Sequence, residues 1–270
     1  MTKGFFFIFV LFFISSCSSY HRGPASGASD KIDIIFDLDW TIVKQVDSIG
    51  SDPLKYIEVS GEFYRIGDGA VELLNYLFSQ EQVRVSFFSG GKYDRNSKLL
   101  KKLNTSYGNA FDNAYKVLSY EDLLEVSTDL KLPFSERLKK DVSLVNENLK
   151  HVLIIDDDKR FIVKEQKSNL LWLGETYKHF EQFSDITDPL DQYSPKSRLT
   201  WNYDRKKLYI VKEILKTAFD SDDSFLRKVA RESKRWNFEH NRPTVGNWQK
   251  LIINFSETSC SDVMINFLTP

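Results

Sequence analysis

Residues 32–41 read I-D-I-I-F-D-L-D-W-T, a short apolar run that ends in two aspartates separated by one leucine. Four more short apolar runs follow along the chain, at residues 83–88, 114–118, 151–155 and 170–173. Runs of this length that are apolar on both faces are typical of strands buried in a parallel sheet. The sequence therefore predicts a parallel sheet of five strands.

The segments between these runs carry apolar residues at helical spacing. Residues 69–78, 94–103 and 134–149 each place leucines or valines three or four positions apart. An alternation of strands and helices predicts crossover connections and a Rossmann-like, three-layer α/β sandwich. Because ligands of such folds bind beyond the carboxyl ends of the strands, functional residues are expected at that edge of the sheet.

The composition of the 270-residue chain limits the kinds of protein it can be. Its 37 Lys and Arg nearly balance 38 Asp and Glu, which argues against a protein that works mainly by coating nucleic acid. The two cysteines, Cys17 and Cys260, exclude a disulfide framework and a cysteine-rich zinc site, and four histidines leave few ligands for a histidine-rich metal centre. Any metal is therefore expected to be held by carboxylates.

Residues 1–16 have the layout of a signal peptide, with the basic residue Lys3 ahead of an unbroken apolar run over residues 5–14. That run is too short for a membrane-spanning helix, which needs about 20 residues. Residues 14–17, I-S-S-C, resemble a bacterial lipobox, so Cys17 is the candidate lipidation site; in an ordinary signal peptide the cysteine would be incidental. The lipobox implies a lipid-anchored protein of the bacterial cell envelope, at the outer membrane and facing the periplasm.

Small and polar residues fill residues 17–30, which are predicted to form a flexible tether. The predicted folded domain spans residues 31–175, and residues 176–270 form a mainly helical extension. Within the extension, residues 204–219 and 222–236 show helical spacing and many basic side chains. A solvated basic surface explains these helices better than contact with anionic lipid or nucleic acid.

Polar residues follow three of the predicted strands. The first run is followed by Asp37 and Asp39, the second by Ser89 and Gly90, and the fourth by the three aspartates at 156–158. Two carboxylates at a strand end can act as a nucleophile and as a general acid or base. A carboxylate nucleophile repels a phosphate dianion unless a cation is present, and hard oxygen ligands suit Mg²⁺. These features point to phosphoryl transfer.

Two other features fit the same chemistry. A serine hydroxyl and the N–H groups of the glycines that follow Ser89 can hold phosphate oxygens. Lys139 or Lys140, ahead of the fourth run, supplies a positive charge. Taken singly, each motif also has an ordinary explanation, as a turn, a helix cap or a solvated lysine.

In this order, the motifs D-L-D-x-T, S-G-G, lysine and paired aspartates resemble those of the haloacid dehalogenase-like superfamily of aspartate-nucleophile phosphatases. Residues 37–43, D-L-D-W-T-I-V, are similar to the first motif of its small C-terminal-domain-phosphatase-like branch. Residues 140–157, K-D-V-S-L-V-N-E-N-L-K-H-V-L-I-I-D-D, are similar to the lysine and acidic motifs of that branch. The resemblance covers residues 31–175.

The resemblance implies a catalytic role for three residues. Asp37 would be the nucleophile, and Asp39 would protonate the leaving group and then activate water. Lys140 fits the family lysine better than Lys139 does. Trp40 stands where the family usually has glutamate or glycine.

The resemblance also implies the residues that hold substrate and metal. Thr41 would support the turn of the first motif, while Ser89 and Gly90 would lie at the phosphate. The implied Mg²⁺ ligands are Asp37, Asp39 through its backbone carbonyl, Asp156 and Asp157, with Asp157 at the usual ligand position of the pair.

The spacing of the motifs leaves no room for a large cap domain. Only 48 positions separate Thr41 from Ser89, and 51 separate Ser89 from Lys140. An open site suits a bulky phosphate monoester, such as a phosphoprotein or a phosphorylated nucleic-acid end, although small esters also fit.

The predicted function is therefore a Mg²⁺-dependent phosphatase that works through a phospho-Asp37 intermediate. One alternative is a broad-specificity periplasmic acid phosphatase that acts on nucleotides or small esters. The fourth motif, I-D-D-D-K-R, does not match the G-D-x-x-x-D that is usual in lipoprotein acid phosphatases. Another alternative is a catalytically silent lipoprotein that binds a partner in the envelope.

Overall fold

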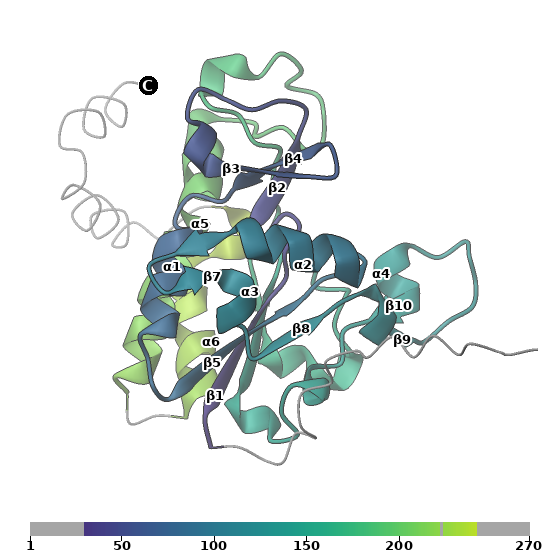
Figure 1. The fold of residues 1–270 in the computed structure, drawn as a ribbon, viewed down its shortest axis with the longest axis vertical. Helices are drawn as coiled ribbons and strands as arrows, with labels where there is room; N and C mark the ends of the chain where they lie inside the picture. The colour runs from purple at the N-terminus through teal and green to yellow at the C-terminus, as the bar shows by residue number, and fades with distance from the viewer. Residues whose placement is uncertain (1–29, 222–223, 242–270) are drawn as a thin grey trace, which may run out of the picture.

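The computed structural model describes residues 30–221 and 224–241. At its centre lies a parallel sheet of five strands in the order β12–β11–β1–β5–β8 (Figure 1). Their bounds are Ile32–Phe36 for β1, Val83–Phe88 for β5, Lys116–Leu118 for β8, Val152–Asp156 for β11 and Leu170–Trp172 for β12. The five predicted strands and the α/β fold class are confirmed.

The register of the three central strands aligns their carboxyl ends. Phe36 of β1 pairs with Ile155 of β11 on one side and with Phe87 of β5 on the other. After β1, the chain forms β5 and β8 on one side of β1 and then β11 and β12 on the other side. A sheet whose strand order reverses in this way has its ligand crevice at the carboxyl edge, beside the reversal.

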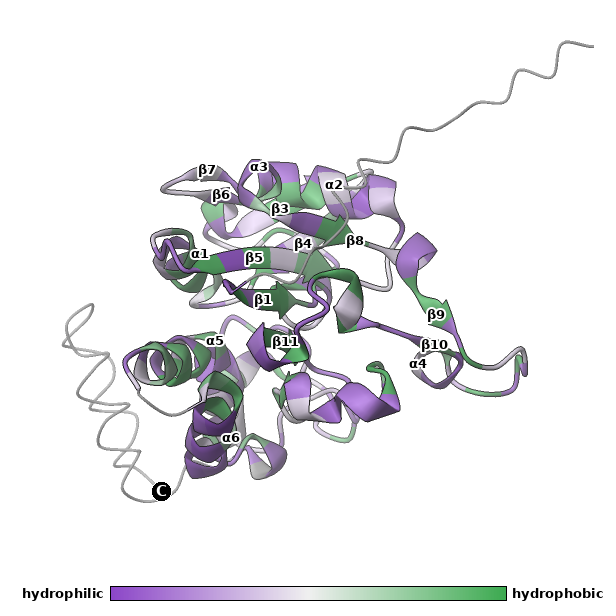
Figure 2. Cartoon of the chain, turned by 90° about the horizontal axis from the view of Figure 1, so that it is seen from below, coloured by the Kyte–Doolittle hydropathy of each residue, from purple (hydrophilic) through white to green (hydrophobic). Residues whose placement is uncertain are grey.

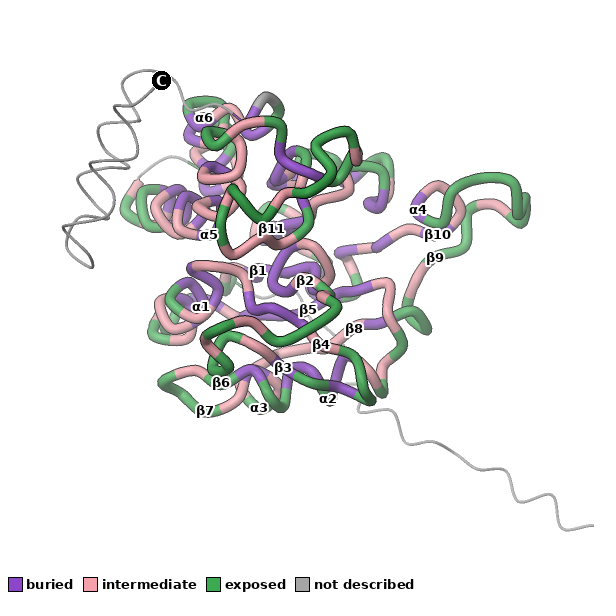
Figure 3. The backbone as a smooth tube through the Cα atoms, turned by 90° about the horizontal axis from the view of Figure 1, so that it is seen from above, coloured by how far each residue is buried: buried purple, intermediate pink, exposed green. Residues whose placement is uncertain are grey.

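Helices cover one face of the sheet. They are α1 (Ala70–Phe78), α2 (Tyr93–Lys102), α5 (Arg198–Phe219) and α6 (Phe225–Trp236). All four contribute buried side chains to the same hydrophobic core as residues of the strands such as Ile34. In Figure 2, α5 shows a hydrophobic and a hydrophilic side, and in Figure 3 the buried backbone runs through the central strands.

The helices α5 and α6 lie beyond residue 175, yet they pack into the core of the sheet. The residues that α5 buries recur at helical spacing and include Leu208, Val211 and Leu215. Tyr203 of α5 donates a hydrogen bond to the backbone carbonyl of Trp236, the last residue of α6. The C-terminal part is therefore helical, as predicted, and it forms part of the layer that covers the sheet.

On the opposite face, the predicted helix over residues 134–149 is wrong. The segment forms a four-residue helix, α4 (Phe134–Arg137), then the short strand β10 (Leu138–Lys139) and a 3-10 turn at Val142–Leu144. The backbone of Lys140 lies in a β-bridge, because its N–H donates to the carbonyl of Phe161 (2.7 Å). This bridge prevents the chain from continuing as a helix.

The apolar spacing in that segment reflects burial and not a helix. Val142 and Val145 pack against the sheet beside Ile35 and Ile154. Residues of a 3-10 turn and of the loop that follows it can point toward the sheet at intervals of three or four positions, as residues of a helix do. Short 3-10 turns thus form the outer layer on this face.

A small antiparallel sheet, called the flap here, connects β1 to α1. It consists of β2 (Val43–Val46), β3 (Tyr56–Val59) and β4 (Glu62–Ile66), in the order β2–β4–β3. Ser60 and Gly61, at the turn between β3 and β4, both have positive φ angles (55° and 85°), as a type I′ hairpin requires. The flap strands take up much of the sequence between the first two motifs, where no large cap was predicted.

The remaining elements are short and lie at the periphery. They are β6 (Asn104–Thr105), β7 (Gly108–Asn109), β9 (Leu124–Glu125), α3 (Ala110–Asn113) and 3-10 turns at Pro53–Lys55, Tyr120–Asp122, Leu149–His151, Lys164–Asn169, Phe183–Asp185 and Phe238–His240.

The predicted signal peptide (1–16), the lipidation site Cys17 and nearly all of the tether (17–30) lie outside the described residues. So do Cys260 and the end of the predicted extension, after residue 241. Within the described ranges, the helices lack the combination of length and hydropathy that crossing a bilayer requires.

Candidate active site

Three of the predicted metal ligands lie together at the carboxyl edge of the sheet. Asp37 follows β1, Asp156 is the last residue of β11, and Asp157 comes next in the chain. Each offers a carboxylate oxygen, and these oxygens lie within 4.8 Å of one another. Asp37 and Asp156 are almost fully buried, at 5% and 2% exposure. The register of β1 and β11 brings these carboxylates together across 119 positions of sequence.

Lys140 supplies a cation to this cluster. Its fully buried Nζ donates to Oδ1 of Asp37 (2.6 Å) and to Oδ2 of Asp156 (2.7 Å). Its backbone is held by the bridge to Phe161, whose ring centroid lies 4.7 Å from Nζ. Burial alone would lower the pKa of Lys140, but the charges of Asp156 and Asp37 outweigh burial and raise it. Lys140 therefore stays protonated.

One lysine does not neutralise three carboxylates. Burial raises the pKa of Asp37 well above its ordinary value; Lys140 opposes this shift, and the charges of Asp156 and Asp157 add to it. Burial, followed by the charge of Asp156, raises the pKa of Asp157 to about 7. A further cation would relieve both effects. Three hard carboxylate donors around one point fit Mg²⁺, so the residues present suit the predicted metal.

The side chain of Asp39 lies apart from this cluster and forms a second group with Ser89 and Arg95. Ser89 Oγ donates to Asp39 Oδ2 (3.0 Å). Arg95 donates to both oxygens, from Nη1 to Oδ1 (2.9 Å) and from Nη2 to Oδ2 (2.5 Å). This paired geometry is the strong, planar form of a charge-assisted hydrogen bond.

Arg95 is a site residue that the sequence reasoning missed. It lies in the first turn of α2, six positions after Ser89, and its position just after the S-G-G motif was the available signal. Gly91 gives it room, because a Cβ on Gly91 would lie 2.1 Å from Arg95 Nη2. Gly90, predicted at the phosphate, is also tightly packed, since a Cβ there would lie 3.0 Å from the ring of Phe134.

The turn of the first motif is held in an uncommon backbone conformation. Trp40 has a φ of 63°, a left-handed value rare for a residue with a large side chain, and its ring packs on Tyr193 at 5.5 Å between centroids. The N–H of Trp40 donates to the carbonyl of Val43 (2.7 Å). Thr41 is buried, and its hydroxyl has no hydrogen-bond partner among the described residues. The backbone thus closes this turn without the Thr41 side chain.

Two further residues that were not predicted hold Asp157 in place. Thr176 Oγ1 donates to Asp157 Oδ2 (3.3 Å), and Trp172 Nε1 donates to the backbone carbonyl of Asp157 (2.8 Å). Asp158, the third aspartate of the run, turns away and pairs with Arg160 (3.0 Å).

A cleft of about 500 Å³ opens beside the three-carboxylate cluster. Asp157 and Asp158 form part of its lining, together with the aromatic side chains of Trp172 and Tyr193 and the basic side chain of Lys159. A cleft of this size holds an organic group of a few rings.

Comparison with models of known protein families gave no match, and comparison with curated protein sequences gave none either. Among solved structures, the chain is similar to a fission yeast RNA polymerase II CTD phosphatase, Fcp1, in a variant bound to beryllium fluoride. Identity is 14%, coverage is 86% of this chain and 67% of that chain, and the TM-score is 0.38. A second structure is that of Fcp1, described as an essential RNA polymerase II CTD phosphatase. Here identity is 15%, coverage is 86% of this chain and 67% of that chain, and the TM-score is 0.37. These likenesses are distant, so function is inferred below from the site itself.

Proposed function

We propose that this chain is a phosphatase that hydrolyses phosphate monoesters with Mg²⁺ and through a phospho-Asp37 intermediate. The observation that carries the proposal is the buried contact of Lys140 with both Asp37 and Asp156, beside Asp157. A lysine that bridges two carboxylates leaves one oxygen of Asp37 for reaction with phosphorus. The order and spacing of the motifs, which resemble the haloacid dehalogenase-like pattern, support the same reaction.

In the first step, an Asp37 oxygen attacks phosphorus while the bond from phosphorus to the ester oxygen breaks, and Asp39, which takes up a proton from solvent once Arg95 releases it, gives that proton to the leaving oxygen. In the second step, a water oxygen attacks phosphorus, Asp39 accepts a proton from that water, and the acyl-phosphate bond to Asp37 breaks. Inorganic phosphate leaves, the Asp37 carboxylate is regenerated, and Asp39 holds the proton that it gives to the next leaving group or returns to solvent when it pairs with Arg95 again. Lys140 keeps Asp37 in position throughout.

Asp37, Asp156, Asp157 and the backbone carbonyl of Asp39 would hold the metal. Bound Mg²⁺ would offset the negative charge of the nucleophile and of the phosphate group.

The Asp39–Arg95 pair must open during this reaction. Both oxygens of Asp39 accept hydrogen bonds from Arg95, and one also accepts from Ser89, so neither is free to reach a leaving group. A phosphate group offers the Arg95 guanidinium a similar planar pair of acceptors. We infer that Arg95 exchanges Asp39 for phosphate oxygens when substrate binds.

The substrate is proposed to be a bulky ester, because the site is open and a large cleft adjoins Asp157. The aromatic side chains of Trp172 and Tyr193 in that cleft favour one alternative, a broad phosphatase for nucleotides or other esters with a flat ring. Lipid anchoring through Cys17 at the outer membrane, facing the periplasm, is proposed from the sequence alone. If Cys17→Ser leaves membrane partitioning unchanged, the anchor is not used.

The test is hydrolysis of p-nitrophenyl phosphate with and without Mg²⁺, with Asp37→Asn beside the unsubstituted chain. Asp94→Asn is the matched control, because Asp94 is exposed and pairs with Lys98 on the surface of α2. We expect metal-dependent turnover that Asp37→Asn abolishes and Asp94→Asn preserves. Absence of turnover on this ester, on nucleotides and on phosphopeptides would instead favour a silent binding protein.

A further inference from the structure

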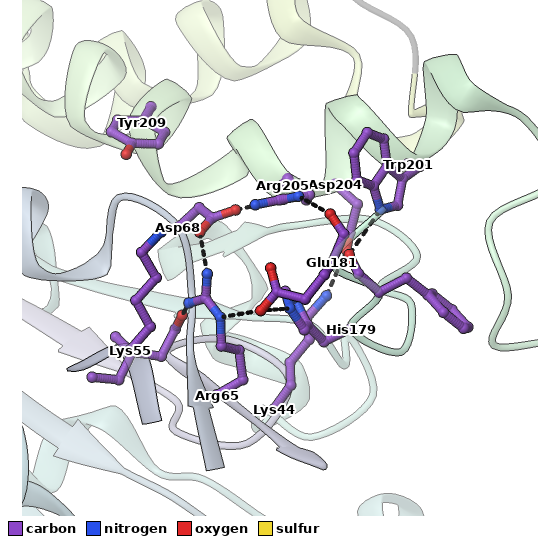
Figure 4. Close-up of polar contacts among 12 residues, drawn as sticks. Lys44, Lys55, Arg65, Asp68, His179, Glu181, Trp201, Asp204, Arg205 and Tyr209 are labelled. Atoms are coloured by element: carbon purple, nitrogen blue, oxygen red, sulfur yellow. Dashed lines mark hydrogen bonds and ion pairs between the residues drawn. The ribbon is translucent and has the colours of Figure 1, made fainter. Parts of the chain in front are cut away.

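A second cavity lies between the flap, helix α5 and the segment that follows β12. Its volume is about 40 Å³, and the turn after Asp39 borders it through Trp40 and Thr41. The charged residues of its lining come from the flap region and from α5: Lys44, Arg65, Asp68, Asp204, Arg205 and Lys207. Figure 4 shows how side chains from these elements converge.

Two lysines share a single carboxylate in this lining. Asp204 accepts hydrogen bonds from Nζ of Lys44 (2.5 Å) and from Nζ of Lys207 (2.9 Å). Lys207 is 3% exposed, and burial lowers its pKa; Asp204 opposes that shift, whereas the charge of Lys44 adds to it. Asp204 is thus shared by two ammonium groups, each of which also donates to a backbone carbonyl, Lys44 to that of Tyr177 (2.6 Å) and Lys207 to that of Glu175.

Two arginines share the other carboxylate. Asp68 accepts from Nη2 of Arg65 (2.7 Å) and from Nε of Arg205 (2.6 Å), as Figure 4 shows. Glu181, whose side chain lies outside the lining, also forms an ion pair with Arg65, at 3.9 Å from Nε. With Glu181 included, four cationic side chains face three carboxylates around the cavity, which leaves one positive charge in excess among the described residues. Buried positive charge without a matching anion is costly.

Polar atoms around the cavity also lack partners. The buried Thr41 hydroxyl makes no hydrogen bond within the described chain, and Arg65 Nε, on a side chain that is 2% exposed, has only the long ion pair with Glu181. His179, also in the lining, contributes no positive charge at neutral pH, because burial and then the charge of Arg65 lower its pKa to about 4. The cavity therefore presents N–H and O–H donors together with excess positive charge.

We propose that this cavity binds a small oxyanion of the chemical class of inorganic phosphate or sulfate. A water molecule needs about 10–15 Å³ of such volume, so 40 Å³ admits about three waters or one tetrahedral oxyanion. The oxyanion accepts from Arg65 Nε and Thr41 Oγ1 and offsets the one excess positive charge. It thereby ties the flap to α5, next to the turn that carries Asp39. This binding does not depend on the proposed phosphatase reaction.

A crystallographic experiment locates the anion. The full-length chain, purified in detergent and kept in EDTA, is crystallised and soaked in selenate, whose selenium gives an anomalous signal. We expect a selenium peak in the cavity, with the selenate oxygens within hydrogen-bond distance of Arg65. Water density there without a selenium peak, or a peak confined to the site beside Lys140, overturns the proposal.

A solution experiment measures affinity with inorganic phosphate as the probe, against chloride at equal ionic strength, by calorimetry in EDTA. Arg65→Met is expected to weaken phosphate binding at least tenfold. Thr41→Val removes only the hydroxyl and is expected to weaken it several-fold, which keeps the test decisive if Arg65→Met fails to fold. Arg235→Met, on the exposed side of α6, is the matched control and should bind like the unsubstituted chain. Unchanged affinity in Thr41→Val and in any folded Arg65→Met chain overturns the proposal.

Discussion

The Nζ atom of Lys140 lies 2.6 Å from Oδ1 of Asp37, although 103 positions of sequence separate the two residues. Both side chains are buried, and the same ammonium group also reaches Asp156. The predicted nucleophile is therefore positioned by an ion pair that only the folded chain can form.

Replacing this lysine should affect both stability and activity. Lys140→Met leaves two buried carboxylates without their cation, and we expect it to lower the free energy of unfolding by about 3–5 kcal/mol. Urea titration at pH 7 in EDTA measures this loss. Adding Asp37→Asn to Lys140→Met should recover part of it, because one uncompensated charge is then removed. Strictly additive losses in the double variant would show that the two side chains do not interact.

The acidic cluster should make the stability of the metal-free chain fall as the pH rises, and bound Mg²⁺ should counteract this loss. The pKa of Asp157 is raised to about 7, so the folded chain holds this proton more tightly than the unfolded chain does. In EDTA, stability should therefore fall as the pH rises from about 4 to 7, by at least about 1 kcal/mol. Mg²⁺ should raise Tm more at pH 8 than at pH 5.

Asp157→Asn is the matched variant for that experiment. It should flatten the pH dependence in EDTA and reduce the response of Tm to Mg²⁺. Thermal unfolding followed by circular dichroism provides both readouts. An equal Mg²⁺ response in this variant and in the unsubstituted chain would place the metal elsewhere.

Arg95 should contribute to turnover by exchanging Asp39 for the phosphate oxygens of the substrate. Arg95→Met removes the cation that is proposed to bind the phosphate oxygens, so we expect kcat/KM to fall about 10- to 100-fold. Steady-state kinetics with p-nitrophenyl phosphate measure the effect. Lys98→Met, an exposed position on the same helix, controls for the loss of a basic residue. If both variants behave alike, Arg95 has no part in the reaction.

The C-terminal helices should be required for a stable sheet. Leu215 of α5 is fully buried in the shared core, and Leu215→Ala should cost about 2–5 kcal/mol of unfolding free energy. Leu199→Ala on the same helix is the control, because Leu199 is 38% exposed and should cost far less. Chemical denaturation compares them. Equal small losses would mean that α5 is only loosely attached to the sheet.

Much of the fold could be predicted because its signals are local. A short run that is apolar on both faces, such as residues 152–155, is best buried as an inner strand. The same signal was ambiguous over residues 134–149, where apolar spacing alone does not distinguish a helix from a buried turn. The backbone bridge between Lys140 and residues 161–163 prevents a helix in that segment. The composition of residues 134–149 does not indicate this bridge.

By itself, then, the sequence determined the five strands, their order along the chain, and the aspartates and serine that follow three of them. These follow from patterns within a few residues. Only the tertiary structure decided which groups meet: that Arg95 reaches Asp39, that α5 covers the sheet, and that cations from the flap and from α5 enclose one cavity. Such contacts depend on packing between segments more than 50 positions apart, where a difference of a few ångströms separates an ion pair from two solvated side chains.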